Sequence, residues 1–208
     1  QYASSVVGLD GTPTVDMWEL SLGERLNHRP VLQDEERTEY IRKALNLNLI
    51  RTTEYVKPYN SADHVYTDRD AALLEAITEN HDERPGVVTT MTAATEYDTN
   101  GVLDVKGIEG GQLNPDVEDA GDVLAGPADT VKWHGDVLGS NEFAQKRVGA
   151  VIGSNHYGDG YIKKWGAYAG TAVEREDEAK GAGLSYGRFG NQILTHMREH
   201  DTLQAAMR

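Results

Sequence analysis

The sequence predicts an α/β fold in which a parallel sheet is flanked by helices. Arg147–Gly153 is a nearly all-apolar run, as expected at the centre of a parallel sheet, and Val87–Thr90 is a second short run rich in β-branched residues. A segment with helical spacing, Arg69–Asn80, precedes the second run, and another begins at Gly160, after the first. This alternation of helices and buried strands is typical of a parallel sheet.

The N-terminal part predicts two helices and two strands. Residues 5–10 are expected to form a short buried strand, and 47–53 alternate well enough to form another. Helical spacing covers Val15–Leu22, with Gly23 near the end, and Asp34–Leu45, which has a narrow apolar stripe.

The middle of the chain combines a helix with a long insertion. Asp68 is expected to cap the helix Arg69–Asn80, and Pro85-Gly86 separates that helix from the strand that follows. Residues 107–130 are rich in Gly, Pro, Asp and Glu, which predicts a long, hydrated acidic loop.

The C-terminal part predicts helices. Asp159 is expected to cap the helix that begins at Gly160, whose stripe toward the core comprises Ile162, Trp165, Ala169 and Ala172. After a polar break at 174–183, a last helical region is expected from Gly190, and the capping-box form of Asp201–Gln204 predicts a new helix at Asp201.

The charge of the chain predicts a halophilic protein. The formal net charge is −14, the acidic residues are spread along the whole length, and there is no cysteine. Such an excess repels itself, and molar salt relieves the repulsion because it shortens the Debye length to about 3 Å. An ordinary acidic cytosolic protein is the alternative.

The ends and the hydropathy of the chain predict a cytoplasmic protein without a membrane span. The apolar runs are far too short to cross a bilayer, and no secretory signal is visible. The chain does not begin with Met, so we expect it to be processed or to be part of a longer protein. It contains no phosphate-binding P-loop, no Gly-x-Gly-x-x-Gly and no Gly-x-Ser-x-Gly.

Three segments, taken in order, carry a resemblance to a known family. They are Leu9–Thr14 (LDGTPT), His134–Phe143 (HGDVLGSNEF) and Gln204–Arg208 (QAAMR). Together they resemble the later half of a superfamily-two helicase, or a related nucleic-acid-dependent ATPase, of the haloarchaeal or haloviral type. The resemblance implies a RecA-like sheet. Residues 1–45 would be the end of a first RecA-like domain with its linker, and 46–208 a second one.

The resemblance also implies roles for individual residues. Thr12 and Thr14 would couple the nucleotide state to the gap between the two domains, and Thr89, Thr90 and Ser140 would lie near the nucleic-acid backbone. Gly139, Asn141 and Glu142 would contact the nucleotide, and Gln204 and Arg208 would point at its γ-phosphate. The implied cofactors are ATP and Mg²⁺, held mainly by a P-loop domain of the same protein outside this chain. The implied partner is nucleic acid, with DNA favoured over RNA. Met207 departs from the glycine of the family pattern, and a second arginine would fall beyond Arg208.

Two other functions stay open. His134, Asp136, His156 and Asp159 could bind a divalent metal for phosphoester hydrolysis. The first pair precedes the run at 147–153 and the second follows it, and the ends of that strand lie about 20 Å apart. Alternatively, the chain is a non-catalytic binding module whose partner surface is aromatic: Trp133, Tyr157, Tyr161, Trp165 and Tyr168.

The chain has no basic groove in its sequence. The clustered cations are Lys146-Arg147 and Lys163-Lys164. Phosphate contacts normally supply much of the affinity for nucleic acid, and they weaken as salt rises. A nucleic-acid motor with this composition would therefore hold phosphates through hydroxyls and backbone amides.

Overall fold

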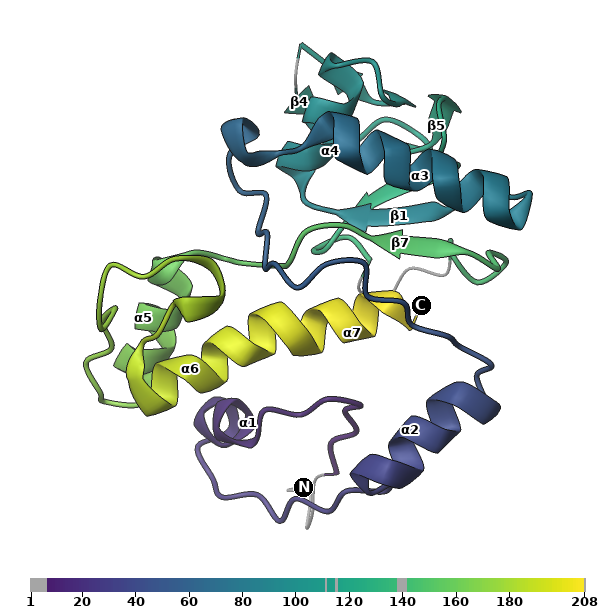
Figure 1. Cartoon of the computed structure of the whole chain (residues 1–208). Helices are drawn as coiled ribbons and strands as arrows, with labels where there is room; N and C mark the ends of the chain where they lie inside the picture. Colours follow the sequence, from purple (N-terminus) through teal and green to yellow (C-terminus); the bar gives the residue numbers. More distant parts are fainter. Residues whose placement is uncertain (1–6, 111, 115, 138–141, 208) are drawn as a thin grey trace.

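The computed structural model describes residues 7–110, 112–114, 116–137 and 142–207 of the chain (Figure 1). Its largest sheet has three parallel strands, β1 (Gly86–Thr89), β6 (Thr130–Trp133) and β7 (Gly149–Val151), in the order β6-β1-β7. Val87 is in register with Val131 on one side and Ala150 on the other. The α/β class is therefore confirmed.

The central strand of this sheet is β1, so the prediction that the run at 147–153 lies at the centre is wrong. All four residues of β1 are buried, whereas β7 pairs with β1 alone and buries fully only Ala150. A strand with a neighbour on one side is less covered, however apolar its sequence is. Residues 130–133, which have a lysine in the middle, form the third strand.

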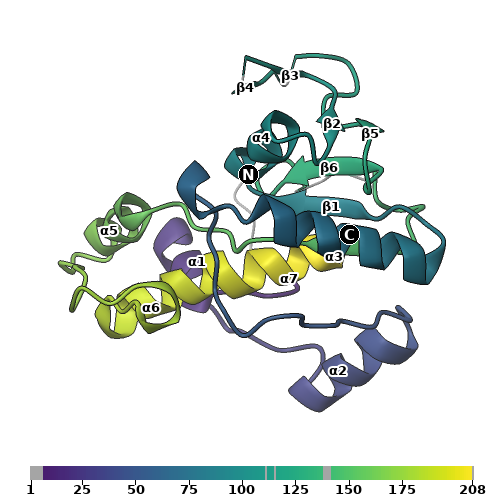
Figure 2. The same cartoon turned by 45° about the horizontal axis from the view of Figure 1, so that its top comes forward.

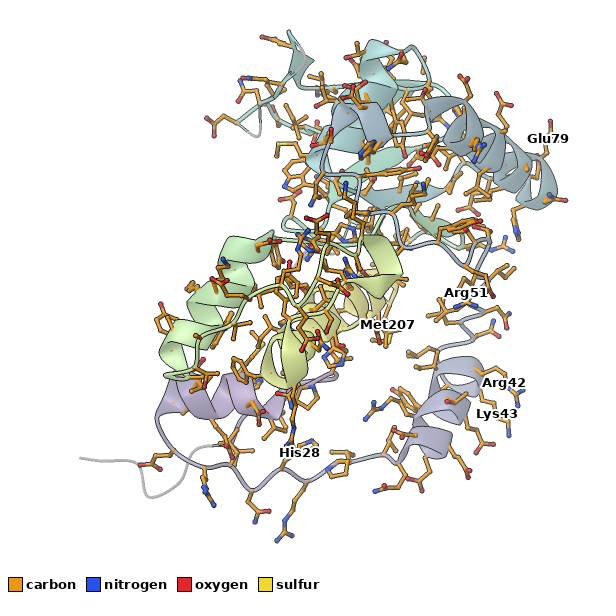
Figure 3. All side chains as sticks on the ribbon, turned by 60° about the vertical axis from the view of Figure 1, so that its left-hand side comes forward. His28, Arg42, Lys43, Arg51, Glu79 and Met207 are labelled. Atoms are coloured by element: carbon orange, nitrogen blue, oxygen red, sulfur yellow. The ribbon has the colours of Figure 1, made fainter. Side chains whose placement is uncertain are left out.

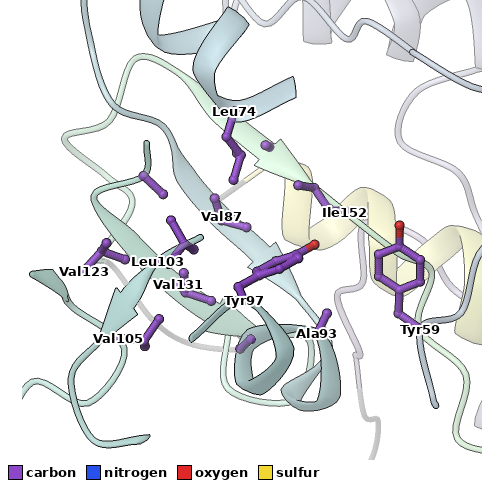
Figure 4. Packing of buried hydrophobic residues seen from close by; sticks show 13 residues of the cluster. Tyr59, Leu74, Val87, Ala93, Tyr97, Leu103, Val105, Val123, Val131 and Ile152 are labelled. Carbon is purple, nitrogen blue, oxygen red and sulfur yellow. The ribbon is translucent and has the colours of Figure 1, made fainter. Parts of the chain in front are cut away.

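Helices cover both faces of the sheet (Figures 1 and 2). On one face α3 (Thr67–His81) and α4 (Met91–Thr99) pack through Leu74 and Tyr97 against Val87 (Figure 4). On the other face α7 (Asp201–Ala206) packs through Ala205 against Val88. Successive side chains of a strand point to opposite faces, so Val87 and Val88 serve the two cores.

A buried carboxylate lies at the edge of the first core. Asp70 on α3 is 7% exposed and accepts hydrogen bonds from the hydroxyls of Tyr59 (3.2 Å) and Tyr97 (2.8 Å). Burial raises the pKa of Asp70, and the two hydrogen bonds offset part of that rise. Asp68, expected as the cap of α3, lies inside its first turn, and Tyr66 occupies the cap position.

The region 107–130, predicted as a long, hydrated loop or insertion, contains short strands as well as loops. Strand β2 pairs with β5, and β3 pairs with β4; both pairs are antiparallel. Turns at Gly107 (φ 90°) and Gly121 (φ 98°) have the left-handed backbone that glycine tolerates. The bounds are β2 Asp104–Val105, β3 Ile108–Glu109, β4 Gln112–Leu113 and β5 Val123–Ala125.

After β7 the chain forms α5 (Asp159–Tyr168), α6 (Gly187–Thr195), a π-helix η3 (His196–His200) and α7. The last three make one continuous helix that runs beneath the sheet (Figure 1). The helix predicted from Asp201 forms as α7, but it continues the preceding helix: Asp201 has helical dihedrals (φ −64°), and His200 rather than Asp201 occupies the N-cap position. Short 3₁₀ turns occupy Ala62–His64 (η1) and Gly181–Gly183 (η2).

Two details of α5 differ from expectation. The cap residue is Gly158, and the carboxylate of Asp159 instead pairs with Arg175 at 3.0 Å. Because α5 ends at Tyr168, Ala169 is its C-cap and Ala172 lies beyond it, so neither extends the stripe formed by Ile162 and Trp165.

Both predicted N-terminal helices form, as α1 (Val15–Leu22) and α2 (Asp34–Lys43), and Gly23 ends α1 with a left-handed φ of 72°. The predicted strands at 7–10 and 47–53 do not form, because no strand of the described chain pairs with them. Residues 5 and 6 lie outside the described residues. The α2 helix stands away from the sheet with Arg42 and Lys43 on its outer side (Figure 3).

The division of the chain at residue 45 stays a prediction. Within the described ranges, every helix is too short or too polar to cross a bilayer.

Candidate functional site

The carboxyl ends of β1, β6 and β7 meet at one edge of the sheet, the usual position of ligand sites in open α/β folds. Thr89 ends β1 there; its side chain is fully buried, and its hydroxyl donates to the carbonyl of Ile152 at 2.7 Å. Thr90 follows and caps α4: its hydroxyl accepts from the Ala93 amide at 3.1 Å and donates to the Tyr59 carbonyl at 2.8 Å. Both hydroxyls are thus engaged inside the protein.

His134 lies at the same edge, directly after β6. Its Nε2 lies 3.3 Å from the carbonyl oxygen of Gly153, so this nitrogen is the protonated donor. Its Nδ1 is buried without a hydrogen-bond partner among the described residues. Burial lowers the pKa of His134, so the ring is neutral at pH 7.

The position of His134 corrects the expectation that it lies about a strand length from the loop after β7. That expectation took residues 134–136 as the start of the strand at 147–153. Because 130–133 form a parallel strand of their own, His134 follows a carboxyl end and lies next to Gly153.

Asp201 connects this edge to the C-terminal helix. Its Oδ2 accepts from Asn155 Nδ2 at 3.0 Å and from the Tyr157 hydroxyl at 3.2 Å. Its Oδ1 lies 3.7 Å from Nε2 of His196, one turn earlier on the same helix. A single carboxylate thus fixes the loop after β7 against the continuous helix.

The segment at 10–14 is held against that helix by five side chains, which we call the clasp: Thr12, Thr14, His196, His200 and Gln204. Gln204 Nε2 donates to Thr12 Oγ1 at 2.5 Å. Thr14 Oγ1 lies 3.0 Å from His196 Nδ1 and 3.2 Å from His200 Nδ1. Thr12 and Thr14 are both buried. Residues about 190 positions apart in the sequence are therefore in direct contact.

Hydrogen-bond accounting restricts the protonation of the clasp. The Thr14 hydroxyl has a single proton, so it can donate to only one of the two imidazoles. The other imidazole must carry its proton on Nδ1 and donate to Thr14. Burial and the neighbouring His196 both lower the pKa of His200, which keeps that ring neutral near pH 7.

A cavity of about 380 Å³ adjoins the clasp. It lies between Pro13–Asp16 and the α6 residues Arg188 and Gln192. The Oε1 atom of Gln192 is buried and has no partner among the described residues. The joint between the N-terminal segment and α6 is therefore not fully packed.

The remaining predicted nucleotide residues are placed only in part. Gly139, Ser140, Asn141 and Arg208 lie outside the described residues. Glu142 forms an ion pair with Lys132 of β6 at 2.8 Å, and Asp136 lies 3.5 Å from the same ammonium group. Burial pulls the pKa of Lys132 down, but the two carboxylates more than offset this and hold it above its usual range. Lys132 therefore anchors both ends of the loop from Asp136 to Glu142.

The four predicted metal ligands do not form one cluster. Asp136 faces Lys132, Asp159 is bound by Arg175 and the Tyr186 hydroxyl, and His156 Nδ1 accepts the Gly158 amide. In the part of the chain that the structure describes, no group of three or more His, Asp or Glu side chains could hold a metal ion.

Sequence reasoning assigned Thr12 and Thr14 a coupling role and Gln204 a role at the γ-phosphate, without predicting that they touch, and it assigned no role at this site to Asn155, His196, His200 or Asp201. The pattern His-x-x-x-His-Asp on the last helix puts three polar side chains near one face and could have identified them. Comparison of the chain with protein-family models, curated proteins and solved structures found no match.

Proposed function

We propose that this chain is the interdomain part of an ATP-dependent nucleic-acid helicase or translocase with a RecA-like fold. It supplies the coupling segment and the trans side of the ATP site. ATP and Mg²⁺ are bound mainly by a P-loop domain of the same protein, and the substrate is nucleic acid, with DNA favoured. This chain has no P-loop and hydrolyses no ATP by itself.

The clasp carries this proposal. The resemblance assigns coupling to Thr12 and Thr14 and nucleotide sensing to Gln204. Gln204 donates a hydrogen bond to Thr12, and Thr14 contacts the two histidines of the clasp on the same continuous helix. A change at Gln204 therefore reaches the 10–14 segment through one bond. A rigid helix, also fixed to the sheet edge through Asp201, transmits the change further.

The parallel sheet supports the same proposal. In P-loop ATPases the coupling groups gather where parallel strands end, and in this chain Thr89, His134 and Asn155 lie at those ends. The internal use of the Thr89 and Thr90 hydroxyls leaves backbone groups and the loop after β7 as the contacts with a phosphate backbone.

The decisive experiment measures ATP hydrolysis by the longer protein that contains this chain, with and without single-stranded DNA. Gln204→Ala removes the link to Thr12, so we expect nucleic-acid stimulation to fall by about 10- to 100-fold while DNA binding persists. Gln145→Ala is the matched control, because Gln145 is an exposed glutamine outside the clasp. Unchanged stimulation in Gln204→Ala, or hydrolysis by the isolated chain, contradicts the proposal.

A further inference from the structure

Four aromatic rings form a continuous row along α5 and the turn before it. The ring centroids of Tyr157 and Tyr161 are 4.9 Å apart, those of Tyr161 and Trp165 6.3 Å, and those of Trp165 and Tyr168 5.7 Å. We call this row the aromatic ladder. Each contact is tilted or edge-on, as aromatic pairs prefer, so the rings support one another at defined angles.

The ladder is open at both ends and anchored in the middle. Tyr157 is 44% exposed and Tyr168 62% exposed, whereas Tyr161 and Trp165 are half-buried against a separate core cluster around Ile162, Val173 and Ile193. The two end rings are therefore open to solvent while the two middle rings hold the row against the protein.

The packing of α5 keeps the ladder rigid. Gly166 lies on the buried side of the helix, where a Cβ atom would come within 2.6 Å of Val173 Cγ2. The helix backbone is therefore in close contact with the segment that follows it. Tyr157, the first ring of the ladder, is fixed near the sheet edge because its hydroxyl donates to Asp201. The other three rings are on α5, which lies to one side of the parallel sheet (Figure 2).

The charges beside the ladder favour an anionic partner. Lys163 and Lys164 are adjacent on α5, and the Lys164 ammonium lies 5.7 Å from the centre of the Tyr168 ring. The other clustered cation, Lys146, is already paired with Asp129. Asp159 is paired with Arg175, and Lys163 is itself paired with Glu174, so Lys164 is the cation beside the outer rung Tyr168. The carboxylate of Asp201 lies at the other end of the ladder, where it accepts the Tyr157 hydroxyl.

We propose that the aromatic ladder is a stacking platform for the bases of a single-stranded nucleic acid, with Tyr168 as its outer rung. Every base has a π-face, so stacking on aromatic side chains accepts any sequence. It also survives salt that screens phosphate contacts, which suits a chain of net charge −14. This inference rests on the proposed function only for the identity of the partner.

Binding of a labelled single-stranded thymidine oligonucleotide of about 12 nucleotides to the chain tests the platform. We expect Tyr168→Ala to weaken binding by about 5- to 150-fold, because one stacked base is lost. Tyr168→Phe keeps the ring and should bind as the unmodified chain does. Tyr40→Ala is the matched control, because Tyr40 on α2 is 49% exposed and lies outside the ladder.

The salt dependence gives a second readout. With few phosphate contacts, affinity should fall only slightly as KCl rises, and Lys164→Gln should reduce the remaining slope by about one. An affinity that is unchanged in Tyr168→Ala, or no binding of the oligonucleotide at all, overturns the platform. If the oligonucleotide still binds the ladder but nucleic acid does not stimulate ATP hydrolysis by the longer protein, the proposed function is contradicted and the stacking platform is not.

Discussion

Replacing Thr14 with valine removes the hydroxyl that joins the N-terminal segment to the C-terminal helix while keeping the volume of the side chain. Thr14 is 9% exposed, so water does not readily take the place of the hydroxyl. The imidazoles of His196 and His200 each lose their contact to Thr14 at once. We expect α1 to be released from the helix more often, while the sheet keeps its stability.

The magnitude follows from the number of bonds lost. Two neutral hydrogen bonds contribute about 0.5 to 1.5 kcal/mol each, so local opening of α1 should become easier by about 1 to 3 kcal/mol. Met17 stays packed in the core cluster around Ile162 and Ile193, which limits the effect. An opening equilibrium shifted by that amount raises amide exchange about 5- to 150-fold.

Hydrogen–deuterium exchange of the α1 amides measures this opening directly. Thr38→Val is the matched control, because the Thr38 hydroxyl bonds only to the Asp34 carbonyl of its own helix. Thr14→Ser should restore most of the protection. Exchange in α1 that rises less than about twofold, or that rises equally in β1, would refute the assignment of the clasp to local docking.

Three further predictions concern stability. Burial raises the pKa of Asp70 in the folded chain above its ordinary value of 3.8, so the folded state holds this proton more tightly than the unfolded state does. The free energy of unfolding should therefore fall as the pH rises above 3.8. Asp70→Asn should abolish this pH dependence in urea unfolding, and an unaltered pH profile in that variant refutes the reasoning. Tyr97→Phe removes one hydrogen bond to Asp70 and should lower the free energy of unfolding by about 1.5 to 3 kcal/mol. Gly166→Ala should cost about 1 to 3 kcal/mol by overpacking against Val173, measured as a lower Tm, and Gly160→Ala, with open space around its Cβ, should not. Lowering KCl from about 2 M to about 0.1 M should lower the Tm, because the repulsion within the net charge of −14 is then no longer screened. Removing a non-ionic osmolyte should lower the Tm less, and equal effects would contradict a halophilic adaptation.

The elements that could be predicted from the sequence are those whose pattern is sufficient by itself. The β1 run is apolar enough to be buried on both faces, and α1 has both helical spacing and a terminal glycine. Residues 5–10 have a similar apolar pattern, yet residues 7–10 form no strand because pairing needs a neighbour that the local sequence does not specify. The α4 helix was missed because its core face is made of alanines and Tyr97, a weak apolar signal.

The candidate site divides in the same way. The motifs gave Thr12 and Gln204 separate roles, and their contact appears only in the structure. The role of Asp201 depends on Asn155, which comes from a different strand end and becomes a neighbour only when the sheet forms. The strand at 130–133 was not recognised because Lys132 interrupts its apolar pattern. The ammonium group of that lysine can be buried because Glu142, Asp136 and the Ala120 carbonyl contact it.

The π-helix at His196–His200 has a consequence for how this region tolerates changes in length. Such a bulge accommodates one extra residue within a single wide turn, so the helices before and after it keep nearly the phase of one regular α-helix. Deleting a single residue at 196–200 would therefore let the segment return to a regular α-helix with Gln204 still close to Thr12 and Ala205 still close to Val88. A one-residue deletion in α6, before the bulge, would instead turn the rest of the helix by about 100°. The bulge is therefore the place where this helix tolerates a change in length by one residue.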